Sequence, residues 1–344
     1  MTDTMLAIDV PTPGGPEALV PTTVAIPEIQ PGEVLIRVAV AGINYPDLLQ
    51  RRGRYDQPPG HSPRLGLEVS GEIAAIGPGV ENFAVGDAVL ALCNGGGYAE
   101  YVAVPAGQVL PLPHGVTMVQ AGAMAETWFT VEHMLMMHGH LQAGMSVLIH
   151  GAAGGIGSAA IALCLIHGAR PIAVVSSEDK AWAAKELGAE DVIIHTQDDF
   201  VAAAKALTDG NGVDRIVNFA GGDILARNMA AAARGAIILQ LASLDSTKSE
   251  IPVNLLLGKA LTLFGATLRP QPIAVKAAIA QGLLRTAWPA FASGTVKLPR
   301  LRAVPLAEAA RAHQALEDRT SYGKIVLLTP FGESFVNDNS VAPA

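Results

Sequence analysis

The feature that most constrains this fold is a glycine-rich turn near the middle of the chain. Residues 146–157 read SVLIHGAAGGIG, so a short run of mostly large apolar residues leads directly into four glycines. The alanine-rich apolar stretch from Ser158 to His167 follows and predicts a helix. A Cβ at such a turn would keep phosphate groups away from the backbone N–H groups and from the positive end of the helix. The pattern therefore predicts the strand–turn–helix unit that binds the pyrophosphate of a dinucleotide.

Length and composition indicate two domains and make several classes of protein improbable. The chain has 344 residues, more than one ordinary core accommodates, and half of them are hydrophobic. The net charge is −8 and there is no Lys/Arg run, so we expect no nucleic-acid partner. No signal peptide and no membrane-spanning run is recognisable, and we expect a cytoplasmic protein. Cys93 and Cys164 are predicted to be isolated buried thiols, because two cysteines form neither a disulfide framework nor a structural zinc site.

The order of predicted elements indicates an α/β fold. Short strands separated by Gly/Pro turns in the first third predict an irregular, largely antiparallel β domain. One long helical region over 119–138 is followed by alternating strands and helices, which is typical of a parallel sheet covered on both faces. We expect the segment after this alternation to return to the first domain. The predicted strands are 34–40, 69–76, 88–92, 147–149, 171–175, 192–195, 213–219, 236–241, 261–268 and 324–328.

The side chains after the second strand of the alternating region indicate which dinucleotide binds. Residues 176–180 read SSEDK. A carboxylate near this position binds the ribose 2′-hydroxyl of NAD, whereas a hydroxyl and an ammonium bind a 2′-phosphate. Ser177 and Lys180 therefore favour NADPH, and His195 at the end of the next strand could reach the same phosphate. Two alternatives stay open: Lys180 can be a solvated residue in the first turn of a helix, and Glu178 can point inward.

The residue types that would hold a catalytic zinc are missing. Zinc needs Cys, His or carboxylate ligands in a fixed constellation. Many reductases of this two-domain design use such a zinc to polarise a carbonyl, and the positions that match their ligands here hold Asn44 and the pair Leu67-Glu68. The spacing of His133, His138 and His140 does not place two imidazoles on one helix face. We therefore predict no metal site. Without a Lewis acid, the hydride acceptor should already be electron-poor, as a quinone or a conjugated enone is.

Five sequence blocks carry a resemblance to a known family that extends to about residue 330. They are AGINYPDLLQRRGRYDQPPG at 41–60, LGLEVSG at 65–71, VGDAV at 85–89, GGGYAEY at 95–101 and GKIV at 323–326. In order and spacing these blocks resemble the zinc-free quinone oxidoreductases of the medium-chain dehydrogenase/reductase superfamily. Within that family, QRRGRYDQPP and AETWFT at 125–130 look most like the branch of the tumour-suppressor-inducible quinone oxidoreductase.

The resemblance implies a domain organisation and an activity. It implies a discontinuous GroES-like catalytic domain over 1–126 and 269–330 and a Rossmann domain with a doubly wound parallel sheet over 127–268. Residues 331–344 have little apolar pattern and are expected to form a flexible tail. The implied activity is NADPH-dependent hydride transfer to a quinone, with the cofactor between the domains. Relatives dimerise by joining Rossmann sheets edge to edge, and the apolar strand at 261–268 is the candidate edge, since such an edge should not remain exposed.

The resemblance also assigns cofactor-binding positions in this sequence. Asn44 and Thr130 are expected near the nicotinamide. The family has Tyr where this chain has His195, which leaves the contact at that position open. The other implied contacts are Gly154, Gly155, Ile156 and Gly157 at the pyrophosphate turn, Ser177, Lys180 and His195 at the adenosine phosphate, Ala220, Leu241 and Leu268 at strand ends, and Lys324 at the cleft.

Asn44 and Tyr55 are the candidate catalytic residues. The amide of Asn44 can donate to the substrate carbonyl or to the cofactor, or it can bond its own backbone in a turn. Tyr55 is expected to line the acceptor pocket and to assist protonation of the product, or only to anchor a proline-rich loop. Trp128 is predicted to be a core residue, and the hydroxyl of Thr130 can instead bond within its own helix. Glu68 is predicted to be a buried carboxylate paired with an arginine.

Three functions remain compatible with the sequence. The first is an NADPH-dependent quinone reductase in which catalysis rests on orientation and exclusion of water. The second is an enone or enoyl-thioester reductase of the same fold. The third is an NADPH-binding protein with little catalysis.

Overall fold

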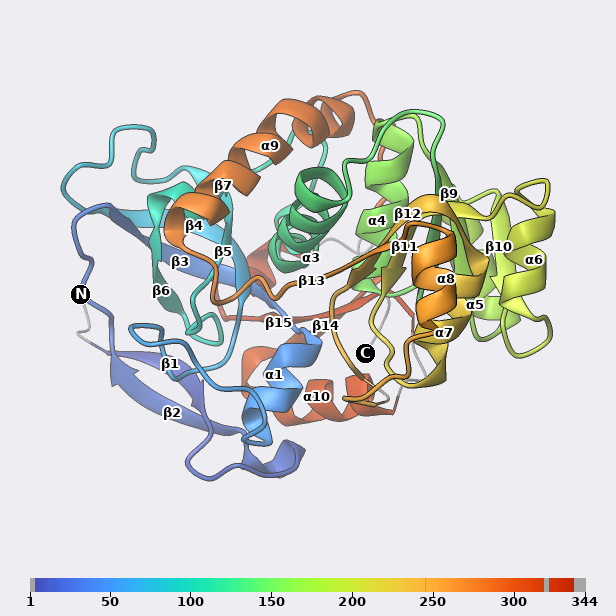
Figure 1. Cartoon of the computed structure of the whole chain (residues 1–344). Helices are drawn as coiled ribbons and strands as arrows, with labels where there is room; N and C mark the ends of the chain where they lie inside the picture. The colour runs from blue at the N-terminus through green and yellow to red at the C-terminus, as the bar shows by residue number, and fades with distance from the viewer. Residues whose placement is uncertain (1–3, 245, 319–321, 337–344) are drawn as a thin grey trace. The chain divides into compact units, whose positions relative to one another are not determined.

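The chain forms two compact units. A computed structural model describes residues 4–244, 246–318 and 322–336 (Figure 1). The first unit comprises residues 1–129, 269–292 and 300–344, and the second comprises 130–268 and 293–299. The first unit is therefore built from segments that lie far apart in the sequence.

The first unit is organised around a seven-stranded sheet. β3 pairs with β4, β6 and β15, and all three pairs are antiparallel. β14 and β15 come from the end of the chain and pair in parallel with each other. Val34, Ile36 and Val38 alternate along β3 toward the core, which explains the period-two apolar pattern. The strands are β1 (Thr4–Asp9) and β2 (Val20–Ala25) in a separate hairpin, and β3 (Glu33–Gly42), β4 (Glu68–Ile76), β5 (Ala88–Leu92), β6 (Tyr101–Pro105), β7 (Val109–Pro111), β14 (Leu301–Pro305) and β15 (Lys324–Leu328).

The long helix predicted over 119–138 is divided into three parts. Gly122 lies between the first two parts, and a Cβ there would come within 2.5 Å of the side chain of Val40. The chain therefore passes too close to β3 at this point for a continuous helix with larger side chains. The three parts are α2 (Met118–Ala121), α3 (Ala125–Val131) and the π-helix η3 (Glu132–His138). Trp128 is buried, as predicted.

The remaining helices of the first unit surround its sheet. The prediction of helices over 273–291 and 306–318 is confirmed by α9 and by η4 with α10. Short α1 and η1 were not predicted. The helices are η1 (Pro16–Ala18), α1 (Tyr45–Arg51), η2 (Ala106–Gln108), α9 (Ile273–Ala292), η4 (Leu306–Glu308) and α10 (Ala309–Glu317).

The start of the segment that was predicted to be a flexible tail forms a short helix. η5 (Gly332–Phe335) follows β15, and Phe331 and Phe335 pack edge to face at 5.2 Å between ring centroids. The guanidinium of Arg37 lies 4.0 Å from the ring centroid of Phe331. Phe331 and Phe335 also pack against the apolar cluster that includes Ala39 and Val40 of β3. Residues 337–344 lie outside the described residues.

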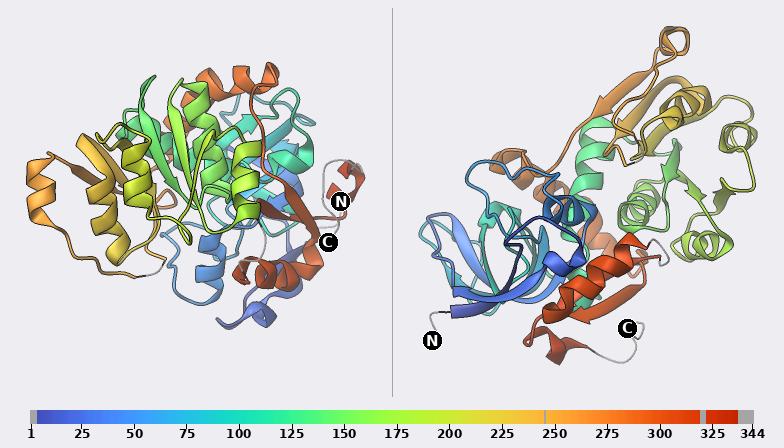
Figure 2. Two further views of the ribbon diagram at one scale, coloured as in Figure 1. Left: turned by 90° about the vertical axis from the view of Figure 1, so that its right-hand side faces the viewer. Right: turned by 90° about the horizontal axis from the view of Figure 1, so that it is seen from below.

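The second unit contains the predicted parallel sheet. Its six strands run in the order β10-β9-β8-β11-β12-β13, and every neighbouring pair is parallel. The order of the sequence reverses between β8 and β11, which is where such sheets bind ligands. Figure 2 shows helices lying along these strands. The elements are β8 (Ser146–His150), α4 (Gly155–Ile166), β9 (Arg170–Val175), α5 (Glu178–Glu186), β10 (Asp191–Ile194), α6 (Phe200–Ala206), β11 (Val213–Asn218), α7 (Asp223–Ala231), β12 (Ala232–Gln240), α8 (Val253–Gly258) and β13 (Thr262–Gly265).

The strand predicted over 261–268 is shorter than expected and lies at an edge of this sheet. β13 covers only residues 262–265 and pairs with β12 on one side. Leu263 on this strand is 40% exposed, and Leu257 on the preceding α8 is 74% exposed.

Cys93 and Cys164 are free and buried, as predicted. No helix within the described ranges is both long and apolar enough to cross a membrane.

Candidate functional site

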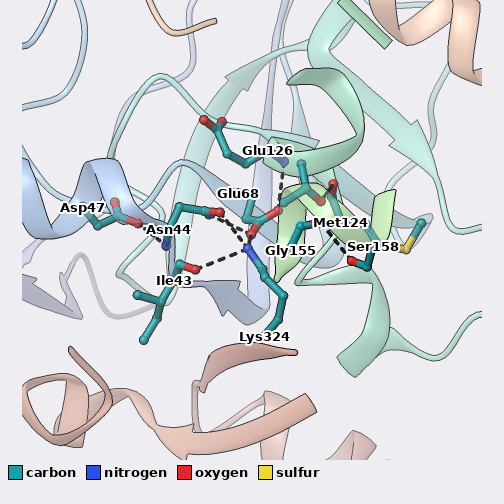
Figure 3. A network of polar contacts seen from close by, with 10 residues as sticks. Ile43, Asn44, Asp47, Glu68, Met124, Glu126, Gly155, Ser158 and Lys324 are labelled. Carbon is teal, nitrogen blue, oxygen red and sulfur yellow. Dashed lines mark hydrogen bonds and ion pairs between the residues drawn. The ribbon is translucent and has the colours of Figure 1, made fainter. Parts of the chain in front are cut away.

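A buried network of charged and amide groups lies where three segments of the first unit meet (Figure 3). Lys324 Nζ lies 2.6 Å from Glu68 Oε1 and 2.7 Å from Asn44 Oδ1, and it also donates to the carbonyl of Ile43 at 3.3 Å. Asn44 Nδ2 donates to Glu68 Oε1 at 2.8 Å. All three side chains are at least nine-tenths buried. We call this group the Asn44–Glu68–Lys324 network.

Strand pairing and helix capping position these three side chains. Glu68 begins β4 and Lys324 begins β15, and both strands pair with β3. Asn44 caps α1, where its backbone N–H donates to Asp47 Oδ2 at 2.9 Å. The second oxygen of Asp47 accepts from the N–H of Gly66 at 3.1 Å. Burial raises the pKa of Asp47 to about 6 despite these hydrogen bonds.

Glu126 extends the network at the start of α3. Its backbone N–H donates to Glu68 Oε2 at 2.9 Å, so the carboxylate of Glu68 is engaged on both oxygens. Burial, together with the nearby carboxylates of Glu68 and Asp47, raises the pKa of the Glu126 carboxyl to about 8. At neutral pH the protonated form of Glu126 therefore predominates.

The structure unites some of the predicted catalytic-domain residues and separates others. Asn44 and Lys324 are in direct contact. Glu68 pairs with Lys324 and not with the predicted arginine, because β15 brings the end of the chain beside the start of β4. Tyr55 is outside the network, and its ring centroid lies 5.5 Å from the guanidinium of Arg269. Burial raises the pKa of Tyr55 to about 12, which makes it a weak proton donor at neutral pH.

The donor set of the network does not suit zinc. Asn44 is a poor ligand and the buried side chain of Leu67 is none. The ammonium of Lys324 lies within 2.7 Å of the oxygens of both Asn44 and Glu68, so a divalent ion bound there would be repelled at close range. Elsewhere, His133 and His138 meet at 3.2 Å between their Nε2 atoms. No group of three or more His, Cys, Asp or Glu residues within the described ranges could hold a metal ion.

The predicted glycine turn connects β8 to α4 in the second unit. Gly154 caps α4, and Gly155, Ile156 and Gly157 form its first turn. A Cβ on Gly157 would lie 2.4 Å from the Cα of Ala152, so only glycine fits there. The turn thus presents the N-terminus of a twelve-residue helix without side chains in front of it. This arrangement suits a bound phosphate group.

The predicted 2′-phosphate residues lie together at the ends of β9 and β10. Ser177 caps α5, and its Oγ accepts from the N–H of Lys180 at 3.4 Å. Lys180 Nζ donates to Ser176 Oγ at 3.1 Å, and the N–H of His195 donates to the carbonyl at the end of β9 at 3.0 Å. Gln197 Nε2 donates to Glu178 Oε1 at 3.2 Å. The carboxylate of Glu178, which in the alternative interpretation points inward, is therefore engaged by this hydrogen bond.

The other predicted strand-end positions lie in the same unit. Gln240 Nε2 donates to the carbonyl of Ala220 at 2.8 Å, and the N–H of Leu241 donates to the carbonyl of Asn218 at 2.8 Å. Ala220 and Leu241 therefore follow neighbouring strands, β11 and β12. Thr130 lies in α3, and buried Leu268 follows β13.

Three polar residues that sequence reasoning did not single out lie near Tyr55 or the network: Glu126, Arg269 and Lys276. Lys276 is 1% exposed and Arg269 is 4% exposed. Lys276 carried a signal, because it is the only charged residue in the first twelve positions of the alanine-rich helix α9. A buried face of such a helix normally carries no ammonium.

Two family models match separate parts of the chain. Residues 30–114 match the alcohol dehydrogenase GroES-like domain. Residues 155–282 match the zinc-binding dehydrogenase family. The first match lies within the first unit, and the second match covers much of the second unit and residues 269–282 of the first.

Curated relatives include a protein of similar length and much longer proteins. The quinone oxidoreductase-like protein 2 homolog of Nematostella vectensis is 32% identical over 307 residues, which is 87% of this chain and 82% of that protein. A mycocerosic acid synthase-like polyketide synthase of Mycobacterium tuberculosis is 31% identical over 300 residues. That match covers 87% of this chain but only 14% of the synthase.

Solved structures of similar fold cover almost the whole chain. Mycobacterial Rv1454c complexed with NADPH is 29% identical, with a TM-score of 0.82 over 94% of this chain and 100% of that chain. Escherichia coli quinone oxidoreductase complexed with NADPH is 26% identical, with a TM-score of 0.81 over 94% and 99% of the two chains.

Proposed function

We propose, on the premise that the chain belongs to the zinc-free quinone oxidoreductase family of the medium-chain dehydrogenase/reductase superfamily, that it transfers a hydride from NADPH to a quinone. The family membership follows from the 32% identity with the Nematostella protein over most of both chains. An oxidoreductase with a GroES-like unit and a Rossmann unit is the corresponding architecture.

The observation that carries the quinone assignment is the Asn44–Glu68–Lys324 network. The ammonium of Lys324 is bound among the oxygens of Asn44 and Glu68, so it would repel a metal ion that could polarise a carbonyl. An acceptor that needs no such activation is therefore favoured. A quinone meets this condition because its carbonyls are conjugated and electron-poor.

The residues of the second unit suit NADPH. When bound, NADPH supplies the hydride. Gly154, Gly155 and Gly157 at the start of α4 would hold its pyrophosphate, and Ser177 and Lys180 would hold its 2′-phosphate. Where an NAD site has a carboxylate that binds the ribose 2′-hydroxyl, this chain offers the hydroxyl of Ser177 and the ammonium of Lys180.

The first unit supplies orientation more than acid–base chemistry. The amide of Asn44 is fixed because Oδ1 accepts from Lys324 and Nδ2 donates one hydrogen to Glu68. Its second amide hydrogen is available to the acceptor carbonyl or the nicotinamide amide. Tyr55, with its raised pKa, would serve as a pocket wall and not as the acid. Such a site lowers the barrier through positioning and exclusion of water.

The first test is NADPH oxidation by the purified protein with 9,10-phenanthrenequinone, with NADH in parallel and zinc measured in the same preparation. We expect quinone-dependent oxidation with a clear preference for NADPH and no stoichiometric zinc. Tight NADPH binding without quinone turnover would refute the proposal.

An enoyl-thioester reductase is the second candidate function. The similarity to polyketide synthases, 31% over most of this chain, favours it specifically. Reduction of a crotonyl thioester with a higher kcat/KM than phenanthrenequinone would select this function. Binding of NADPH with no turnover of either acceptor would instead indicate a cofactor-binding protein with little catalysis.

We also propose a homodimer formed through the edge of the second unit's sheet. Exposed apolar side chains on β13 and α8, Leu263 and Leu257, support this interface. Light scattering should give a dimer, and Leu263→Lys should convert it to a monomer. A monomeric wild-type protein would contradict the proposal.

A further inference from the structure

Two histidine side chains meet at the end of the first helical region of the second unit. The Nε2 atoms of His133 and His138 lie 3.2 Å apart. The two ring planes are nearly perpendicular, at 82°, and the ring centroids are 4.8 Å apart. The rings therefore approach each other through these nitrogen atoms. We call them the His133–His138 pair.

The π-helix η3 brings the two rings together. An α-helix has 3.6 residues per turn, so side chains five positions apart point in clearly different directions. In η3 the N–H of Gly139 donates to the carbonyl of Met134 at 2.7 Å, a hydrogen bond across five positions. This wider turn places His133 and His138 on one face, contrary to the prediction from their spacing. Such π-helical turns are frequent at functional sites.

Neighbouring strands of the same unit fix the pair in place. The ring of His138 stacks on Phe264 of β13, with 4.0 Å between ring centroids and 18° between ring planes. Arg215 of β11 donates to the carbonyl of Gly139, directly after η3. His133 is 3% exposed, so packing holds its ring. The two nitrogen atoms are therefore positioned before any ligand binds.

The separation of the two nitrogen atoms suits a shared metal ion. Imidazole nitrogens lie about 2.0–2.1 Å from Zn²⁺, and two such ligands are about 2.9–3.4 Å apart when the angle at the ion is about 90–110°. The observed distance of 3.2 Å lies within this range. Angles of this size occur in tetragonal Cu²⁺ and Ni²⁺ sites and in tetrahedral Zn²⁺ sites, and imidazole is a ligand that all three ions accept.

We propose that the His133–His138 pair binds one divalent ion of a late transition metal, Cu²⁺ most tightly, through its two Nε2 atoms. In the metal-free protein, one Nε2 carries a hydrogen and donates it to the other. On binding, this hydrogen moves to Nδ1 of the same ring. Both imidazoles stay neutral, and the lone pair of each Nε2 forms a bond to the ion.

Water completes the coordination shell of such an ion. His138 is half-buried and His140 is exposed, so the pair lies next to the surface from which an ion arrives. Within the described ranges, no group of three or more His, Cys, Asp or Glu residues could hold a metal ion, so the pair has no third ligand of these types there. A site with two protein ligands releases its ion more readily than a structural zinc site with four. We therefore expect the ion to be lost during purification.

The test is a titration of the untagged, EDTA-treated protein with Cu²⁺, observed by calorimetry and by electron paramagnetic resonance. We expect one tightly bound Cu²⁺ per chain, with superhyperfine splitting from two imidazole nitrogens. His138→Gln should weaken binding at least about tenfold and leave one nitrogen at the copper. Ni²⁺ and Zn²⁺ should bind more weakly than Cu²⁺ to the wild type.

His140→Asn is the matched control. It removes an exposed imidazole two positions away, and asparagine tolerates the positive φ of 47° at this position. This variant should bind Cu²⁺ as the wild type does. His138→Phe is a second test variant, because it keeps a ring against Phe264 and removes the ligand nitrogen. Circular dichroism identifies the variants that fold.

The outcomes decide the inference without any measurement of NADPH oxidation, so they do not depend on the proposed reductase function. Weaker binding in a folded His138 variant, with His140→Asn unchanged, would support the inference. An equal loss in His140→Asn would assign the copper to exposed imidazoles in general and overturn it. Wild-type protein without a two-nitrogen copper signal, or a folded His138→Phe that binds like the wild type, would also overturn it.

Discussion

Replacing Lys324 by Met should destabilise the first unit more than any surface substitution. The carboxylate of Glu68 is fully buried, and among the described residues Lys324 is its only cationic partner. Breaking a buried ion pair by removing one member costs about 3–5 kcal/mol, because the remaining charge stays buried without compensation. The hydrogen bonds that Glu68 accepts from Asn44 and Glu126 remain, so we expect the lower end of this range.

A double-mutant cycle isolates the interaction from the other effects of each substitution. The variants are Lys324→Met, Glu68→Gln and the double substitution, measured by urea unfolding with a probe in the first unit. Removing both charges should recover much of the loss, which gives a coupling energy of about 2–3 kcal/mol.

A surface pair in the same unit provides the matched control. Arg311 and Glu308 form an ion pair at 2.9 Å, with side chains 47% and 49% exposed. The cycle with Arg311→Met and Glu308→Gln should give a coupling of about 0.2–1 kcal/mol. A Lys324–Glu68 coupling no larger than this control would refute the reasoning that the network is a tightly held buried cation site.

Four other predictions concern single positions. Gly157→Ala should lower both the urea midpoint and NADPH affinity, because its Cβ would lie 2.4 Å from a backbone carbon, whereas Gly258→Ala, with open space around it, should do neither. Lys180→Met should raise the Kd for NADPH about tenfold or more without affecting NADH, as titrations of both cofactors would show. Tyr55→Phe should reduce but not abolish steady-state turnover, and complete loss in a folded, NADPH-binding variant would contradict a positioning mechanism. The folded pKa of Asp47, about 6, lies above its ordinary 3.8, so the native chain binds the extra proton between these values; the free energy of unfolding should fall by about 2 kcal/mol from pH 4 to pH 6 relative to Asp47→Asn, as pH-dependent urea curves would reveal.

The second unit was predictable because its signals are local. Each buried strand is a short apolar run, each helix follows within a few residues, and the glycine turn marks the first crossover. β2 and β14 gave weak signals because much of each strand is exposed or half-buried, so its apolar pattern is incomplete. The division of the predicted helix at Gly122 depends on a contact with β3, which no helical periodicity contains.

The candidate site was predictable only as a set of separate residues. Asn44 and Lys324 could be assigned through motif blocks, but Glu68 and Lys324 are 256 positions apart and their pairing arises from the sheet. Likewise, the loop residue His61 lies near two cations from another part of the chain: Arg269, which precedes α9, and Lys276, in the first turn of α9. Such an assembly arises from tertiary packing, which local sequence patterns do not predict.

The pairing of β15 with β3 determines the order in which the two units can fold during synthesis. Lys324 and Ile43 meet although they are 281 positions apart, and the strands of the second unit are all synthesised between them. At a synthesis rate of about 5–20 residues per second, β15 is made roughly 15–60 s after β3. During that interval the growing chain carries an open strand edge and a Glu68 carboxylate without its cation. The second unit can fold as it emerges, whereas the first acquires its missing strands and its internal charge balance in a single late step.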